Sequence, residues 1–385
     1  MNRVTVFRTT RRIVMGVGAI QQIPEEIRLL KGRKVLIVTD KGLLKAGLVD
    51  VLKQVLEKAQ IKSAIFDEVE ADPRYEISAG CVEMIQREKV DLVIGFGGGS
   101  PIDIAKISAV MAKNDGPLAE YFGIELIPHP GLPTIIVPTT AGTASEVTPI
   151  VILSDEKAKL KRGIVSAHLQ PSVALLDPEL TLGLPPSITA ATGMDALIHA
   201  IEAFTSVNAT GMTDTLASRA MELLYGNIRT AFANGKNLEA RSAMLEGSLT
   251  AGISFANCGV TAVHAFAYPI GAEFHIPHGI ANTLMLPHVM RFNLLGNVPK
   301  FACIGEVFGL MTEGLDDLRA AEEVVAAIER LAVDLRVPQH LAEFGIKESD
   351  IPRLAEGVMQ VTRLLANNPR QVTLEDAVDI YRAAL

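Results

Sequence analysis

The sequence predicts two domains: an α/β domain with an open parallel sheet over residues 1–185, and an all-helical domain over residues 186–385. Up to Pro185, short apolar runs rich in β-branched residues alternate with stretches of helical periodicity, a pattern typical of a parallel sheet covered by helices. After the doubled proline at Pro185 and Pro186, nearly every segment has a 3.6-residue period. Apolar residues make up 49% of the chain, which is enough to bury a large core.

Five runs are predicted to be strands of the sheet, because apolar residues would occupy both of their faces. They cover residues 35–39, 63–66, 91–96, 134–137 and 173–176. Helices are expected between them, for example over 48–59 and 77–88. In such a sheet the ligand binds beyond the carboxyl ends of the strands, so the residues that follow each strand are the first candidates for function.

Periodicity predicts nine helices in the second domain. They cover residues 187–206, 212–233, 237–256, 259–274, 279–295, 300–311, 317–335, 348–366 and 374–384. Ser187 is a candidate N-cap of the first helix. The last helix opens with Thr373 and Asp376, a variant of the capping box in which Asp replaces Glu.

Composition limits the partners that we expect. The formal net charge is −8 and no long basic run occurs, which makes nucleic acid and anionic membranes poor partners. No apolar run approaches the ~20 residues needed to cross a bilayer, and the start lacks the apolar segment of a signal peptide, so a cytoplasmic protein is expected. The three cysteines show no C-x-x-C spacing and are expected in the core. The expected ligand is a small molecule.

Two predicted strands end in candidate nucleotide-binding groups. Asp40 follows the first, where an acidic side chain can bind both hydroxyls of an adenosine ribose and repel a 2′-phosphate; this favours NAD over NADP. Ordinary turn or N-cap chemistry is the alternative for Asp40. Glycines occupy residues 97–99, directly between the third strand and a helical pattern, so backbone N–H groups there could bind a pyrophosphate. A plain tight turn is the alternative, because neither G-x-G-x-x-G nor the Walker pattern is present.

A third candidate loop follows the fourth predicted strand. Residues 139–148 contain five hydroxyl side chains, which could hydrogen-bond the phosphates or the amide of a nucleotide. A polar turn with a helix cap is the alternative interpretation.

The second domain contains a candidate metal site. Asp195 and His199 stand four residues apart in a helical pattern, so both side chains project from one face about a turn apart. His264 and His278 follow, and five of the eight histidines lie between positions 199 and 288. Imidazole and carboxylate together suit a borderline divalent cation such as Fe²⁺ or Zn²⁺. A side-chain hydrogen bond between Asp195 and His199 is the alternative.

Five motifs occur in order along nearly the whole chain. They are Gly97-Gly-Gly-Ser-Pro-Ile-Asp-Ile-Ala-Lys106, Pro138-Thr-Thr-Ala-Gly-Thr-Ala-Ser-Glu-Val-Thr148, Asp177-Pro-Glu-Leu-Thr181, Gly193-Met-Asp-Ala-Leu-Ile-His-Ala-Ile-Glu202 and Pro277-His-Gly279. Together they resemble the iron-dependent, or group III, alcohol dehydrogenases, which include lactaldehyde reductases and propanediol dehydrogenases. The resemblance implies a dehydroquinate synthase-like fold, with a dinucleotide-binding α/β domain followed by an all-α metal-binding domain.

The resemblance also implies roles for particular residues. The metal ligands would be Asp195, His199, His264 and His278, with Fe²⁺ as the expected ion and Zn²⁺ as the alternative. The NAD contacts would be Asp40 at the ribose; Gly98, Gly99, Ser100 and Asp103 at the phosphates; Thr139, Thr140, Thr143 and Thr148 in the cofactor loop; Lys161; and Leu180 at the nicotinamide. We also expect a homodimer or a larger homo-oligomer.

The chain departs from the family pattern at one position. Many members have a second histidine four residues after the third ligand, and here that residue is Tyr268. A proton relay through that histidine is therefore in doubt, and His275 is a spare imidazole close to the fourth ligand. His275 and His278 are our candidate catalytic residues, with a surface or helix-end role as the alternative for His275.

The resemblance implies reversible hydride transfer between a small alcohol and NAD⁺, with the aldehyde as the substrate in the reverse direction. Related metal- and NAD-dependent enzymes, similar to glycerol dehydrogenase or dehydroquinate synthase, are one alternative. A non-catalytic protein that binds a nucleotide or a metal is the other.

Overall fold

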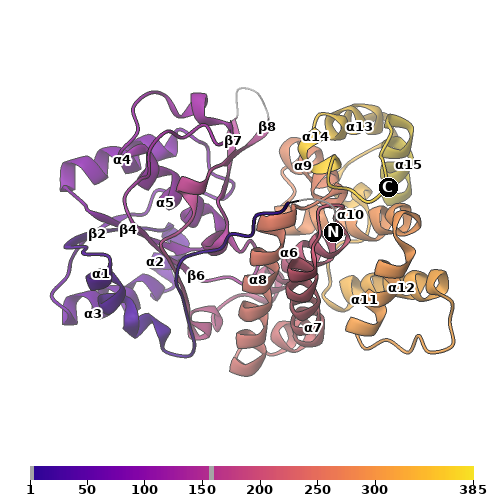
Figure 1. Cartoon of the computed structure of the whole chain (residues 1–385), viewed down its shortest axis with the longest axis horizontal. Coiled ribbons are helices and arrows are strands. Elements are labelled where there is room, and N and C mark those ends of the chain that lie inside the picture. The colour runs from indigo at the N-terminus through magenta and orange to yellow at the C-terminus, as the bar shows by residue number, and fades with distance from the viewer. Residues whose placement is uncertain (1–3, 156–159) are drawn as a thin grey trace. The chain divides into compact units, whose positions relative to one another are not determined.

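A computed structural model describes residues 4–155 and 160–385, in which the chain divides into two units. The α/β unit is Arg8–Gly183, and the helical unit is Leu184–Leu385 together with residues 4–7. Figure 1 shows strands in the α/β unit and helices throughout residues 184–385.

A six-stranded parallel sheet organises the α/β unit, in the order β1-β9-β6-β4-β2-β3. Its strands are β1 (Ile13–Met15), β2 (Lys34–Val38), β3 (Lys62–Phe66), β4 (Leu92–Gly97), β6 (Thr134–Pro138) and β9 (Val173–Leu176). The predicted fold class and the five predicted strands are confirmed. The sequence does not predict β1, because a three-residue strand at the edge of a sheet has too short an apolar run.

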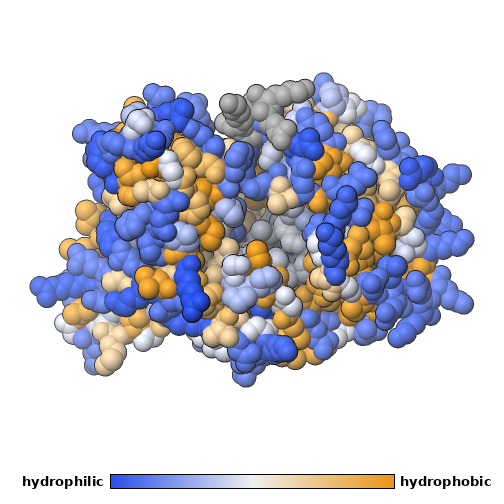
Figure 2. All heavy atoms as spheres, turned by 180° about the vertical axis from the view of Figure 1, so that it is seen from behind, coloured by the Kyte–Doolittle hydropathy of each residue, from blue (hydrophilic) through white to orange (hydrophobic). Residues whose placement is uncertain are grey.

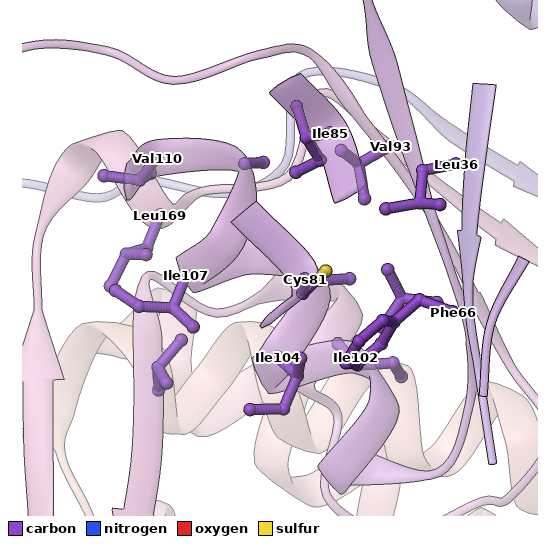
Figure 3. Close-up of a cluster of buried hydrophobic side chains, with 14 of the residues drawn as sticks. Leu36, Phe66, Cys81, Ile85, Val93, Ile102, Ile104, Ile107, Val110 and Leu169 are labelled. Atoms are coloured by element: carbon purple, nitrogen blue, oxygen red, sulfur yellow. The ribbon is translucent and has the colours of Figure 1, made fainter. Parts of the chain in front are cut away.

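Each face of this sheet has its own apolar core, because successive strand residues point to opposite faces. The helices of the unit are α1 (Ile23–Leu29), α2 (Lys41–Lys45), α3 (Leu48–Lys58), α4 (Ile77–Glu88) and α5 (Gly99–Met111). Val35 and Ile37 of β2 pack in one core with α1 and α3. Leu36 lies in the other core with Cys81 of α4 and the apolar residues of α5 (Figure 3).

A second, three-stranded sheet in the α/β unit is not predicted by the sequence. Its order is β5-β8-β7, and its strands are β5 (Gly123–Ile124), β7 (Ile150–Asp155) and β8 (Leu160–Val165). β7 and β8 are antiparallel. β8 contains Lys161, Arg162 and Gly163, so its own sequence carries little strand signal and the pairing with β7 decides its conformation.

Ten α-helices form the helical unit. They are α6 (Pro186–Thr205), α7 (Gly211–Ala233), α8 (Leu238–Cys258), α9 (Ala262–Phe274), α10 (His278–Asn293), α11 (Val298–Val307), α12 (Asp317–Asp334), α13 (Ile351–Met359), α14 (Thr362–Leu365) and α15 (Leu374–Ala384). Residues 184–385 are all described, and none is in a strand. The all-helical prediction is thereby confirmed.

Two local predictions for this unit are wrong and one is confirmed. The helix predicted over 348–366 is broken between α13 and α14. Ser187 is not an N-cap, because α6 begins at Pro186, where the fixed φ of proline suits a first helical position. Thr373 and Asp376 do form the capping box of α15, with the two reciprocal bonds 3.2 and 2.9 Å long.

No single helix in the described part of the chain is long and apolar enough to span a membrane. Within residues 4–155 and 160–385, only α8 and α9 taken as a pair, bent by 102°, reach the required length and composition. Hydrophilic and hydrophobic residues are interspersed over the face in Figure 2.

Candidate functional site

Four side chains from three helices converge in the helical unit: Asp195, His199, His264 and His278. The Nε2 atoms of His199 and His264 are 3.0 Å apart. Asp195 Oδ1 is 3.8 Å from Nε2 of His264 and 3.8 Å from Nε2 of His278. One ligand atom each from Asp195, His199 and His264 lies within 4.8 Å of the others, a spacing that could hold a metal ion.

Local structure explains how this histidine cluster forms. Asp195 and His199 lie one turn apart on α6, His264 is the third residue of α9, and His278 is the first residue of α10. Gly279 allows α10 to begin against α6, because a Cβ at this position would lie 2.2 Å from the carbonyl oxygen of Ala191. The Pro277-His-Gly279 motif therefore has a packing reason as well as a chemical one.

The electrostatics of the cluster favour positive charge. Burial alone raises the pKa of Asp195, but His199, His278 and His264 outweigh it, so the pKa of this carboxyl lies below its ordinary value. Burial alone lowers the pKa of His264, yet Glu202 and Asp195 raise it above the ordinary value. The cluster therefore attracts a cation, whether a proton or a metal ion.

Glu202 is part of the site, although it is not among the residues predicted from the sequence. It is 1% exposed, its Oε2 contacts Nδ1 of His264, and its Oε1 accepts hydrogen bonds from the start of α9. The signal was present, because Glu202 follows Asp195 and His199 at helical spacings of seven and three residues, which place it on the same face of α6.

Asn282 also lies in the site and is likewise not among the predicted residues. Its Nδ2 is 2.7 Å from Asp195 Oδ1, 3.1 Å from His278 Nε2 and 3.2 Å from His264 Nε2. Its Oδ1 is buried without a hydrogen-bond partner among the described residues. An amide has only two hydrogens for three such neighbours, so it does not satisfy them all, whereas a cation could take electron pairs from each. One carboxylate with three imidazoles suits Fe²⁺ or Zn²⁺.

Tyr268 and His275 differ in their relation to the cluster. Tyr268 lies one turn after His264 on α9, with its ring centroid 6.2 Å from that of His278. His275 is exposed and forms the C-cap of α9 with φ 53°, a left-handed conformation that is uncommon outside glycine. The cluster is connected through Glu202 and Asn282 rather than through His275.

In the α/β unit, the predicted nucleotide loops lie at the carboxyl ends of neighbouring strands. Asp40 follows β2, the glycines follow β4 and the threonines follow β6, and these strands are adjacent in the sheet. The strand order reverses direction between β2 and β4, which is where ligands of such sheets bind.

The glycine loop and the threonine loop are in close contact. A Cβ at Gly99 would lie 2.8 Å from Cγ2 of Thr143, while a Cβ at Gly98 would meet Thr140 Oγ1 at an ordinary 3.6 Å. α5 begins at Gly99 with Gly98 as N-cap, and no side-chain cap bond is formed. The first N–H groups of α5 therefore point out of the helix end beside half-buried threonines, as a phosphate site requires.

Other predicted nucleotide contacts have structural partners inside this unit. Asp40 Oδ1 accepts a hydrogen bond from the backbone of Leu43 (3.0 Å), so the N-cap alternative is present in the structure. Asp103 is buried and accepts from the N–H of Ile152 (2.9 Å), and Lys161 binds Asp72 (2.7 Å).

The remaining predicted contacts are also placed within the α/β unit. The N–H of Thr139 donates to the carbonyl of Gly97 (2.9 Å), which joins the two loops. Ser100 lies half-buried in the first turn of α5. Leu180 follows β9 and packs in an apolar core of the sheet.

Lys106 supports the threonine loop, a role that the sequence does not indicate. Its Nζ donates to the carbonyl oxygens of Ser145 (3.0 Å), Thr148 (2.8 Å) and Ile150 (2.6 Å). Burial lowers the pKa of Lys106 to about 8 and raises that of nearby Glu146 to about 7. The buried Lys106 ammonium thus binds the loop through three carbonyl oxygens.

A parallel sheet with a glycine loop beyond its strands and a helical unit with a buried Asp-His cluster are expected of an enzyme that combines a nucleotide with a metal ion. The family model described as iron-containing alcohol dehydrogenase matches residues 10–178. The model for the C-terminal part of the Fe-containing alcohol dehydrogenase family matches residues 189–385. The chain belongs to this family and is an oxidoreductase, which confirms the predicted resemblance.

Individual proteins agree with the family models. The 1,3-propanediol dehydrogenase of Klebsiella pneumoniae is 44% identical over 371 residues, which cover 96% of each chain. The sulfoacetaldehyde reductase of Bilophila wadsworthia (strain 3_1_6) is 39% identical over 380 residues, or 98% of each. A crystal structure of a 1,3-propanediol oxidoreductase matches all of both chains with a TM-score of 0.97 and 42% identity. These similarities support an alcohol dehydrogenase over the two alternatives.

Proposed function

We propose that the protein is a metal-dependent alcohol dehydrogenase that reversibly transfers a hydride between a small alcohol and NAD⁺, with Asp195, His199, His264 and His278 as metal ligands. One observation carries the proposal: ligand atoms from Asp195, His199 and His264 lie within 4.8 Å of one another, in a buried site, although they come from two helices. His278 adds a fourth donor beside Asp195.

Different residues would bind the metal ion and admit the substrate. A divalent cation held by the four ligands would act as a Lewis acid that stabilises negative charge on the alcohol oxygen. Asp195 contributes the only carboxylate among the four ligands, so a divalent cation together with these ligands would retain a net positive charge. The side chain of His278 is 30% exposed, while those of Asp195 and His264 are at most 4% exposed, so a substrate would approach from the side of His278.

For NAD, we propose the contacts that the sequence predicts. Gly98, Gly99 and Ser100 would bind the phosphates through the start of α5, and Asp40 would accept the ribose hydroxyls. The support is the adjacency of these residues beyond β2 and β4. The proposed set of NAD contacts is completed by the threonine loop and by three further residues. They are Thr139, Thr140, Thr143 and Thr148 in the loop, and Asp103, Lys161 and Leu180.

Several finer points belong to the same proposal. Fe²⁺ is the expected ion, since the family models describe iron-containing enzymes, and Zn²⁺ would suit the same donors. Small diols and aldehydes are the expected substrates, since related proteins are named for 1,3-propanediol and sulfoacetaldehyde. A cytoplasmic homodimer or larger homo-oligomer and a division of the chain at residue 185 remain our expectations.

Metal-free protein tests the proposal directly. The purified full chain is treated with a chelator and assayed for NADH formation with a panel of small alcohols, before and after addition of Fe²⁺ or Zn²⁺. We expect no NADH without metal and recovered turnover with it. If metal analysis shows that the metal has been removed completely and turnover is undiminished, the metal assignment is contradicted. Metal-dependent chemistry without net NADH formation would favour the dehydroquinate synthase-like alternative.

A further inference from the structure

Glu202 has two carboxylate oxygens with separate tasks in the helical unit. Oε1 accepts hydrogen bonds from Thr261 Oγ1 (2.8 Å), Thr261 N (3.1 Å) and Val263 N (2.8 Å). These N–H groups lie at the start of α9, which has no intrahelical acceptor for them. Thr261, the N-cap residue, makes no side-chain cap bond itself, so a carboxylate on α6 caps α9.

The other oxygen of Glu202 is directed at the histidine cluster. Oε2 contacts Nδ1 of His264, and the opposite ring nitrogen, Nε2, lies 3.0 Å from Nε2 of His199 and 3.8 Å from Asp195 Oδ1. An ionised carboxylate only accepts hydrogen bonds, so Nδ1 carries the proton in this contact. In a neutral imidazole the lone pair is then on Nε2, the atom that faces the other candidate ligands.

We infer that Glu202 is a positioning residue that holds His264 in the Nδ1–H tautomer and fixes its ring, so that Nε2 is available to the metal. This inference rests on the metal site proposed above. Metal ligation requires an unprotonated ring nitrogen, and a histidine that can exchange tautomers offers the correct nitrogen only part of the time. The same side chain fixes the start of α9, so backbone and ring are oriented by one buried group.

Glutamine at this position separates the two tasks. With its oxygen kept toward Thr261 and Val263, the cap of α9 remains, and the NH₂ group faces Nδ1 of His264. That contact is a hydrogen bond only if Nδ1 accepts, which puts the ring proton on Nε2. The flipped amide would place NH₂ hydrogens against the N–H groups of Thr261 and Val263, which can only donate, and is disfavoured.

The expected consequence of Glu202→Gln is weaker metal binding in a folded protein. The loss should be roughly 10- to 100-fold in affinity, the usual effect of removing the partner of a metal-binding histidine. Thr261→Val is the matched control, because it removes one donor to Oε1 and leaves the contact between Oε2 and His264. It should lower the melting temperature and leave metal affinity unchanged.

The experiment uses the full chain with Zn²⁺ as the probe. Zn²⁺ affinity is measured by competition with a chromophoric chelator, folding by thermal unfolding, and the His264 tautomer by ¹⁵N NMR of the histidine-labelled metal-free protein. We expect Nδ1–H in the unaltered chain, and in Glu202→Gln an Nε2–H ring, weakened Zn²⁺ binding and near-normal unfolding.

Two contrary outcomes are distinguishable. Unaltered Zn²⁺ affinity and an Nδ1–H ring in Glu202→Gln, while His199→Ala loses the ion, would overturn the role of Glu202 and leave the metal site intact. If His199→Ala binds Zn²⁺ as the unaltered chain does, the proposed site fails and the inference fails with it. Should Glu202→Gln unfold, the unaltered chain still tests the inference, because an Nε2–H ring of His264 in the metal-free protein would overturn the role of Glu202.

Discussion

The histidine cluster of the helical unit and the loops of the α/β unit are built in opposite ways. The cluster consists of side-chain donor atoms, with Asp195, His199 and His264 buried and oriented by hydrogen bonds. The loops consist of backbone and space: Gly99 has no Cβ that would clash with Thr143, and Lys106 binds carbonyl groups of the threonine loop. A substitution in the cluster therefore removes a metal-binding atom, whereas a substitution in the loops changes how closely the backbone can approach its neighbours.

The largest effect is expected in the cluster. His264→Ala should weaken metal binding by orders of magnitude and abolish turnover, because one of four ligands is lost while the helices remain. Metal analysis, an NADH assay and circular dichroism check this. His288→Ala, on α10 but outside the cluster, is the control and should retain both metal and activity. Normal metal content in His264→Ala would remove the distinction between the two regions.

The buried charged groups near the threonine loop should make the stability of the α/β unit depend on pH. Burial raises the pKa of Glu146 to about 7 from 4.5, so between these pH values the folded state keeps a proton that the unfolded state loses. Stability of the α/β unit should therefore fall as pH rises from 4.5 to 7, by up to about 3 kcal/mol. Hydrogen exchange of the amides of this unit measures the change. In Glu146→Gln the slope should become shallower, with the remainder due to buried Asp103, whose pKa is also raised by burial; an unchanged slope would assign it to other groups.

A proton relay through His275 is expected to give a smaller effect. As a hypothesis, His275→Ala slows turnover by roughly 10²-fold with the metal retained, the low end for a lost general acid or base. Tyr268→Phe should cost less, because tyrosine titrates near pH 10. His275→Asn is the control for the positive φ at this position, since Asn tolerates it. An unchanged rate and pH profile in both His275 variants would leave His275 with a helix-end role alone.

In the glycine loop, the loss of stability caused by an added methyl group should be larger where that group lies closer to its neighbour. Gly99→Ala brings a methyl group within 2.8 Å of Thr143 and should cost about 1–3 kcal/mol in stability and NAD affinity together. Gly98→Ala meets Thr140 at ordinary contact, so it should leave the melting temperature nearly unchanged, and any loss of NAD affinity would come from the cofactor's own approach. Thermal unfolding and NADH fluorescence titration separate the two. Equal destabilisation in both variants would argue against this packing.

Cofactor choice gives the smallest expected effect. Asp40→Asn keeps a side-chain acceptor for Leu43, so the cap of α2 survives, and only the charge is removed. The ratio of kcat/KM for NAD⁺ over NADP⁺ should fall about tenfold, equivalent to about 1.4 kcal/mol. Asp40→Gly should also relax the preference and should destabilise α2 as well. A preference of the unaltered chain for NADP⁺ would show that Asp40 does not contact the ribose.

The elements that the sequence determined are those with a strong local pattern. The five apolar runs are strands and the periodic segments after Pro185 are helices, because burial of both faces or of one stripe requires those patterns whatever the partner. The spacing of Asp195 and His199 follows from the helix repeat alone. The Thr373 and Asp376 capping box is equally local.

Tertiary structure alone decided the pairing of β7 with β8 and the partners of the buried polar groups. Lys106 binds carbonyl groups about 40 residues away, and Glu202 and Asn282 reach His264 and Asp195 from other helices. No local period encodes such contacts, because a hydrogen bond depends on where two distant backbones are brought by packing of their apolar faces. The same reason separates a histidine in the cluster from one at a helix end: His264 and His275 lie on or beside one helix, and only the packing of α6 and α10 decides which of them is enclosed.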